Sequence, residues 1–400
     1  MSGNQTRTRR QWLGTCAGVA GTTALAGCFD SDTDENDGNE NDVSGDPADA
    51  SSSTDWPMYG VDLQNTGYQP NATGPSGDEL TARKVHDIGG GSSYPVILAD
   101  DRLYATSRDG VVLAFDRESE ELLWKEDGHG PLMAHDGMIY GPRASHSVYG
   151  YDMEGGDRWE SDEIELDSSL NLNNEPIPTP NGVFVISDNH VWNVDLDSGD
   201  YTSVRRYPRN SRDLIGTTDV PAYHDGILYH AMGVELYALN VETGDHEWTV
   251  KGENVLHIGN PTVFNGMVFV SGGDEQLHAY DAKSGEEVWT VETTTGVETS
   301  PAVADGIVYL GDNQRVIAVK AESGEIKWEI EKPLPESEVV IADDVVYLAN
   351  SLGVIALDCN TGDLHWEMEF NGYFTSSPVI SGETIYVPAL DDKLYAIEGS

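Results

Sequence analysis

The stretch AYDAKSGEEVW, residues 279–289, decides the fold because its pattern recurs along the chain. The copy ALDCNTGDLHW, residues 356–366, keeps the Asp, the hydroxyl residue, the Gly and the Trp in the same places. Looser copies end at Trp124, Trp159, Trp248 and Trp328, and a degenerate copy ends at Val204. Successive copies end 35 to 45 residues apart. A repeat of this length with four strands per unit is typical of a β-propeller blade.

The copy at residues 261–291 shows why each unit is expected to fold as four antiparallel strands. Apolar runs flank Asn265-Gly266, a strong two-residue hairpin signal. Gly285 supplies a positive φ at a later turn, and Asp281 can accept backbone N–H bonds within that turn. Trp289 is large and rigid enough to fill the wedge between neighbouring blades, with its indole N–H aimed at a carbonyl. We therefore interpret the six repeat tryptophans as structural docking residues: Trp124, Trp159, Trp248, Trp289, Trp328 and Trp366.

Eight blades are predicted from the starts of the inner strands, near Pro95, Pro131, Pro176, Pro221, Pro261, Pro301, Val339 and Pro378. The eighth unit ends close to the C-terminus without a fourth strand, and residues 79–88 can supply it. An all-β ring closed by strands from both termini removes two open sheet edges. Seven blades are the alternative if the degenerate third repeat does not form.

The repeats resemble the tryptophan-docking motif of propellers of the pyrroloquinoline-quinone (PQQ) type. The lead-in WPMYGVDLQNTGY, residues 56–68, is similar to the N-terminal segment of the same group. The resemblance covers about residues 55–400. The group includes quinoprotein alcohol dehydrogenases, which use PQQ and calcium, and non-enzymatic lipoproteins such as the outer-membrane assembly scaffold of Gram-negative bacteria. It therefore implies the fold and leaves two classes of function open.

The N-terminus resembles an export signal. Arg9-Arg10 lies in a segment similar to the twin-arginine motif, and residues 25–28 (LAGC) match a lipobox. We predict a signal peptide at 1–27, lipid on Cys28, and placement on the extracytoplasmic face of the cell membrane. Residues 28–54 are acidic and low in apolar side chains, so they are predicted to form a disordered tether before the propeller at 55–400.

The chain carries 70 Asp and Glu against 22 Lys and Arg, a net charge of −48. Such a charge repels itself at low salt and is screened at about 1 M salt, where the Debye length is about 3 Å. This balance indicates a surface protein of a halophile, of haloarchaeal type. It argues against nucleic acid as a partner. Asn71 begins an N-glycosylation sequon in an expected surface loop.

Two groups of residues are candidates for binding. Loops at one mouth of the central channel carry polar side chains that would be funnel ligands: Asn174, Glu175, His190, His230, His257 and Asn260. A basic run where the third repeat meets the fourth is a candidate partner loop that can bind carboxylates: Arg205, Arg206, Arg209 and Arg212. The identity of any metal stays unknown at this stage.

The leading hypothesis is a monomeric, membrane-anchored scaffold that binds a cell-envelope protein or a small molecule without catalysis or cofactor. The second is a PQQ- and calcium-dependent alcohol or sugar dehydrogenase. Adjacent cysteines are absent, and eight blades in about 346 residues leave little chain for insertions that cover a cofactor. A substrate-capturing lipoprotein is the third hypothesis.

Overall fold

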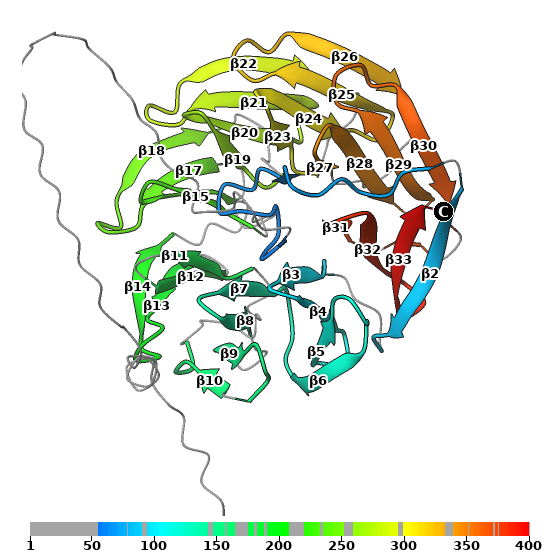
Figure 1. The fold of residues 1–400 in the computed structure, drawn as a ribbon. Coiled ribbons are helices and arrows are strands. Elements are labelled where there is room, and N and C mark those ends of the chain that lie inside the picture. The colour runs from blue at the N-terminus through cyan, green and yellow to red at the C-terminus, as the bar shows by residue number, and fades with distance from the viewer. Residues whose placement is uncertain are drawn as a thin grey trace, which may run out of the picture.

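The computed structural model shows an eight-bladed β-propeller, which confirms the predicted architecture (Figure 1). It describes residues 55–77, 79–89, 94–142, 147–156, 158–164, 175–179, 182–187, 190–207, 220–232, 235–251, 259–294, 299–332, 339–350, 352–370, 373–374 and 376–399. The predicted signal peptide, the tether and Cys28 lie outside these residues. Each blade is a four-stranded sheet whose strands follow one another from the channel outward.

The first four blades are continuous in sequence. Blade 1 contains β3 (Ile97–Ala99), β4 (Arg102–Ser107), β5 (Val111–Asp116) and β6 (Leu122–Asp127). Blade 2 contains β7 (Met133–His135), β8 (Met138–Pro142), β9 (Val148–Asp152) and β10 (Arg158–Glu160). Blade 3 contains β11 (Ile177–Thr179), β12 (Gly182–Ser187), β13 (His190–Val194) and β14 (Tyr201–Arg206). Blade 4 contains β15 (Ala222–His224), β16 (Ile227–Met232), β17 (Glu235–Asn240) and β18 (His246–Lys251).

Blades 5 to 7 repeat this order. Blade 5 contains β19 (Thr262–Phe264), β20 (Met267–Gly272), β21 (Gln276–Asp281) and β22 (Glu287–Glu292). Blade 6 contains β23 (Ala302–Ala304), β24 (Ile307–Gly311), β25 (Arg315–Lys320) and β26 (Ile326–Glu331). Blade 7 contains β27 (Val339–Ala342), β28 (Val345–Asn350), β29 (Gly353–Asp358) and β30 (Leu364–Glu369), and β1 (Tyr68–Gln69) pairs with β27 in parallel.

The last blade closes the ring with strands from both termini, as predicted. It contains β31 (Val379–Ser381), β32 (Thr384–Ala389) and β33 (Lys393–Gly399), and β2 (Leu80–Asp87) is its outer strand. Figure 1 shows β2 beside β33, at opposite ends of the colour scale. The degenerate third repeat also forms a full blade, so the count is eight and not seven.

The turn chemistry of the repeat explains why the strands end where they do. In blade 5, the Asp281 carboxylate accepts the backbone N–H of Ser284 at 2.7 Å and its hydroxyl at 2.8 Å. These bonds hold the pKa of Asp281 below its usual range, with the Ser284 hydroxyl the largest cause. Gly285 follows with a φ of +71°, a conformation that a side chain would resist.

Five of the six repeat tryptophans donate an indole N–H bond to the chain beyond their own blade, and the sixth, Trp159, is buried edge-on against Tyr140. The indole N–H of Trp328 donates to the Cys359 carbonyl of blade 7 at 2.9 Å. Its ring lies over Gly362, where an added Cβ would come within 2.7 Å of it. Four other tryptophans donate equivalent bonds of 2.8 to 3.1 Å: Trp124 to Met153, Trp248 to Ala282, Trp289 to Ala321 and Trp366 to Pro75. The interface therefore needs both the large Trp ring and a glycine, which has no side chain, beneath it.

The interface between blades 3 and 4 lacks the tryptophan and closes differently. Gly244 of blade 4 approaches the Val204 backbone so closely that an added Cβ would lie 2.6 Å from its carbonyl oxygen. Farther along, Tyr207 packs against Tyr237 with ring centroids 4.7 Å apart. The Tyr207 hydroxyl lies 2.7 Å from the buried Nε2 of His230. An aromatic cluster thus packs between blades 3 and 4, beyond the place where the Val204 backbone replaces the indole.

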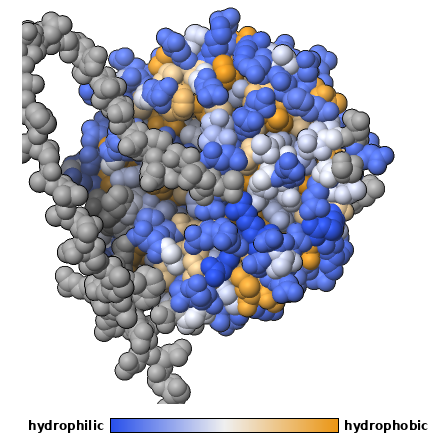
Figure 2. Space-filling model, in the orientation of Figure 1, coloured by the Kyte–Doolittle hydropathy of each residue, from blue (hydrophilic) through white to orange (hydrophobic). Residues whose placement is uncertain are grey.

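The outer surface is mostly hydrophilic, and the face in Figure 2 carries only scattered hydrophobic residues. In the part of the chain that the structure describes, no helix has the length and apolar character needed to cross a bilayer.

Candidate functional site

The central channel is lined by the lead-in segment, residues 55–74, here called the strap. The strap passes the inner strands of the blades in blade order. In most blades it forms a backbone hydrogen bond at the corresponding position of the inner strand. Trp56 exchanges two backbone hydrogen bonds with Leu98 of blade 1, at 2.9 and 2.8 Å. Further strap carbonyls accept backbone N–H bonds of 2.6 to 2.9 Å: Pro57 from Ala134, Leu63 from Tyr223, Gln64 from Val263, Thr66 from Val303 and Gly67 from Ile341. The strap is thus an inner ring of the fold, seen as the blue ribbon near the middle of Figure 1.

Blade 3 interrupts this pattern for a reason visible in its sequence. The corresponding residue of β11 is Pro178, which has no backbone N–H to donate. Next to it, the buried Glu175 carboxylate accepts the backbone N–H of Tyr59 at 2.8 Å. A side chain therefore attaches the strap where the backbone cannot.

A polar network fixes the middle of the strap. The Asp62 carboxylate accepts the backbone N–H of Gln64 at 2.9 Å and both the N–H and the hydroxyl of Thr66. Burial raises the pKa of Asp62 in spite of these bonds. The Asn65 amide donates to the carbonyls of Val220 and Pro261 at 3.4 and 3.0 Å, so the network ties the strap to blades 4 and 5.

A small pocket lies between the strap and the inner-strand starts of blades 1, 6, 7 and 8. The strap contributes Trp56, Tyr59, Gly60, Asn65 and Gly67, and the starts of the inner strands contribute Pro95, Ser300, Pro301, Val339, Val340 and Ser377. None of these lining residues is charged. The centres of water molecules can reach about 20 Å³ of the pocket, roughly what one or two waters need.

The four predicted funnel ligands that the structure describes do not line this pocket. Glu175 holds the strap, as described above. The Asn260 amide oxygen accepts the backbone N–H of Val220 at 3.0 Å, which links two inter-blade connections. His190 lies on β13, stacked on Trp192 with ring centroids 4.1 Å apart and hydrogen-bonded to the Ser203 hydroxyl. Asn174 and His257 lie outside the described residues.

His230 is placed between blades 3 and 4, away from the channel mouth where it was expected. It is 1% exposed, its Nδ1 has no hydrogen-bond partner, and burial lowers its pKa to about 3, with His246 adding to the shift. The ring is therefore neutral at ordinary pH. His230 alternates along β16 with Tyr229, which faces the next blade instead.

The candidate partner loop also needs a correction. Arg205 and Arg206 lie on strand β14, paired with β13, rather than in a loop. The Arg205 guanidinium donates to the Gly244 carbonyl at 3.2 Å, so this arginine joins blades 3 and 4. Arg209 and Arg212 lie outside the described residues. Asn71 is exposed after β1, where a surface loop was expected.

The pocket chemistry does not fit PQQ, a planar quinone with three carboxylates. The described lining offers no Lys or Arg for those carboxylates and no Asp or Glu for a calcium ion. Among the described residues, no three His, Cys, Asp or Glu side chains gather as a metal site would require. Cys359 is 7% exposed beneath Trp328, and burial raises the pKa of its thiol to about 12.

The fold and the strap define a class, the eight-bladed propellers built from PQQ-like repeats. Residues 66–214 and 186–400 match the family described as outer membrane protein assembly factor BamB, and the chain belongs to this family.

Individual relatives fall into two groups. BamB of Yersinia pestis is 34% identical over 102 residues, 24% of this chain and 25% of that protein. The quinohemoprotein alcohol dehydrogenase of Comamonas testosteroni is 30% identical over 144 residues, 30% of this chain and 20% of that protein. The aligned segments thus span a quarter or less of these two relatives.

Solved structures show the same division. BamB from Moraxella catarrhalis superposes with a TM-score of 0.64 at 16% identity, covering 80% of this chain and 99% of that one. The Comamonas testosteroni dehydrogenase superposes with a TM-score of 0.66 at 13% identity, covering 88% and 82%. Identities this low show the shared fold and do not decide between a scaffold and an enzyme.

Proposed function

We propose that this protein is a non-catalytic binding or assembly scaffold of the cell envelope. The observation that carries the proposal is the lined channel: the chain's own strap runs round the inner strands, where a propeller can hold a ligand. The uncharged pocket beside the strap has room for little more than water. A rigid ring of this kind works by presenting its loops to a partner.

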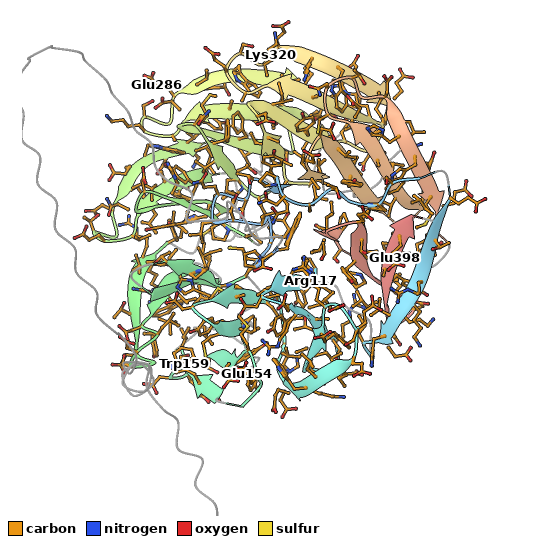
Figure 3. All side chains as sticks on the ribbon, in the orientation of Figure 1. Arg117, Glu154, Trp159, Glu286, Lys320 and Glu398 are labelled. Carbon is orange, nitrogen blue, oxygen red and sulfur yellow. The ribbon has the colours of Figure 1, made fainter. Side chains whose placement is uncertain are left out.

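The attachment of the strap supports a defined orientation. The Asp55 carboxylate accepts the backbone N–H of Asp100 at 3.2 Å and pairs with Arg117 at 3.3 Å. Asp100 lies in the β3–β4 turn and Arg117 in the β5–β6 turn, and Arg117 also reaches Ser381 of the last blade (Figure 3). Asp55, the first described residue, is therefore held at the end of the ring that carries these turns. If residues 28–54 are a tether from a lipid on Cys28, the opposite end faces away from the membrane.

The dehydrogenase is the second candidate because relatives in that class align with this chain. Trp56 does place an aromatic ring in the lining of the pocket beside the strap. In the described part of the chain no charged side chain lines this pocket, which argues against PQQ and calcium there. The small size of this pocket also argues against a role in capturing small molecules.

An activity assay tests the proposal. The purified full chain is incubated with PQQ and calcium in molar salt, and reduction of an artificial electron acceptor is measured with short-chain alcohols and sugars. The scaffold proposal expects no rate above that of PQQ with calcium alone. A rate that saturates with both alcohol and PQQ would make the protein a dehydrogenase.

A further inference from the structure

Large hydrophobic side chains are exposed at eight described positions, and their distribution is uneven. Five lie on outer strands of blades 1, 5, 6 and 7: Leu122, Leu123, Val288, Ile326 and Leu364. Single exposed side chains of this kind are normal on a protein surface. The other three are Leu352, Tyr373 and Leu390, with exposures of 57%, 54% and 52%, and all three come from blades 7 and 8.

These three residues lie together on one end of the ring, and we call them the apolar patch. Leu352 is in the β28–β29 turn, Leu390 in the β32–β33 turn, and Tyr373 in the connection between the two blades. The Leu390 N–H donates to the Tyr373 carbonyl at 2.9 Å. The Leu352 carbonyl accepts the N–H of Phe370 at the same distance.

Stacked aromatic rings support the patch from below. Phe370 and Phe374 stack with centroids 4.2 Å apart and planes 5° from parallel. Tyr395 of β33 meets the Phe370 ring edge-on at 4.7 Å. The Phe370 N–H bond to Leu352 and the place of Phe374 after Tyr373 put this stack next to the connections that carry the exposed residues. Exposed apolar side chains that gather at one place on the surface mark interaction sites on soluble proteins.

The backbone of Tyr373 provides an independent observation. Its φ is +54°, whereas nearly all other described non-glycine residues with a positive φ are Asp, Asn or Glu. Asp and Asn tolerate this region, but a bulky residue there is strained. A residue better suited to the turn would be Gly or Asn. The chain instead keeps an aromatic ring here, more than half exposed.

The charges around the patch restrict what can cover it. Glu369, Asp391 and Asp392 adjoin the patch, and Lys393 pairs with Asp391. A second copy that met it through the same surface would bring these carboxylates against their own counterparts, at contact distances where salt screens charges least. The chain's own residues 29–55 hold ten Asp or Glu and no Lys or Arg, so they are repelled as well. The complementary occupant is a different, basic chain.

The position of the patch fits the orientation argued above. Turns between second and third strands, together with inter-blade connections, lie at one end of the ring. The β3–β4 and β5–β6 turns that hold Asp55 lie at the other end. The patch is thus on the end opposite to the one that holds Asp55.

We propose that the apolar patch binds a segment of a partner protein whose aliphatic and aromatic side chains are flanked by lysines or arginines. This inference rests on the proposed scaffold function and adds the surface and the chemistry of the partner. The apolar side chains would lie over Leu352, Tyr373 and Leu390, and the basic flanks would meet the neighbouring carboxylates.

Site-specific photo-crosslinking of the full chain in its native membranes tests the proposal. Leu390 is replaced by benzoylphenylalanine, with the same replacement at Leu122 as a matched rim control and at Arg206 as a control on another blade. Crosslinked peptides are identified by mass spectrometry. We expect a foreign chain to be captured at 390 and not at 122, through a peptide with apolar residues flanked by Lys or Arg.

A second variant adds Leu352→Ser and Tyr373→Ser to the crosslinker at 390. Losing two exposed anchors that contribute more than about 1 kcal/mol each should lower capture at least about tenfold. The melting temperature should stay near that of the parent, since exposed substitutions cost within about 0.5 kcal/mol. Unchanged capture would overturn the proposal, as would equal capture at 390 and 122, a crosslink to a second copy, or a crosslink to the chain's own N-terminal segment.

The controls separate this inference from the scaffold proposal. Capture of a foreign chain at 206 but not at 390 would support the scaffold proposal and refute the proposed role of the apolar patch. The absence of capture at every position, together with PQQ-dependent alcohol oxidation, would refute both proposals.

Discussion

Replacing Trp328 by Ala should destabilise the propeller by about 3–5 kcal/mol, the usual cost of removing a buried Trp side chain. Trp328 is 8% exposed and packs over Gly362 of the next blade. Most of the loss should come from the cavity. The Cys359 carbonyl that accepts the indole N–H also accepts the Tyr309 hydroxyl at 3.2 Å, so it keeps a partner. The lost hydrogen bond then adds only about 1 kcal/mol to the cost.

The assay is thermal and denaturant unfolding in molar salt, with Leu364→Ala as the control. Leu364 is 52% exposed, so that variant should unfold within about 0.5 kcal/mol of the parent. For Trp328→Ala the melting temperature should fall by roughly 6–10 °C, at about 2 °C for each kcal/mol.

A double-mutant cycle with Gly362→Ala makes the test specific to the contact. An added Cβ at Gly362 lies 2.7 Å from the Trp328 ring and sits on a φ of +75°. Removing the ring removes the clash and leaves only the backbone cost. The double variant should therefore be more stable than the sum of the single changes predicts, by at least about 1 kcal/mol. Additive effects, or a Trp328→Ala variant that melts like the parent, would refute the docking argument.

Three further results are expected. Cys28→Ala should release the protein from membranes into the soluble fraction, and retention in the membrane would contradict lipid anchoring at this residue. Lowering the salt from about 2 M to about 0.1 M lengthens the Debye length from about 2 to about 10 Å, so the melting temperature should fall, whereas a constant value would contradict the halophile interpretation. Burial lowers the pKa of His230 to about 3 from 6.5, so the folded state binds fewer protons than the unfolded state between these values, and stability should decrease as pH falls through that window. His230→Gln should weaken this dependence of stability on pH, compared with the control variant His365→Gln. An equal pH dependence in the two variants would contradict the argument from burial of His230.

The blades were predictable because each repeat carries its own turn chemistry. Asn265-Gly266, Asp281 and Gly285 encode two turns of blade 5 locally, and the structure has its four strands where the pattern puts them. Closure of the ring by β2 could be predicted by counting strands, because the eighth unit ends without a fourth strand. Blade 3 forms without a repeat Trp because its strands pair with one another, the Val204 backbone packs on Gly244, and Tyr207 packs on Tyr237 of blade 4.

The site was less predictable, since it depends on contacts that are distant in sequence. The strap has no repeat period, and its route round the channel depends on bonds to Leu98, Tyr223 and Ile341. Polar residues near a loop, such as Glu175 and His230, gave no signal of whether they face the channel or a neighbouring blade. The clearest local signal was Pro178, which lacks the N–H that an inner strand would donate to the strap. The apolar patch could not be read from single residues either, because Leu352, Tyr373 and Leu390 come from three separate connections.

Calorimetric titration of the full chain with PQQ and calcium in molar salt tests the central claim most directly. A scaffold whose channel is lined by its own strap predicts heats no different from dilution. Saturable binding at micromolar concentration or tighter would contradict the scaffold account and restore the quinoprotein dehydrogenase.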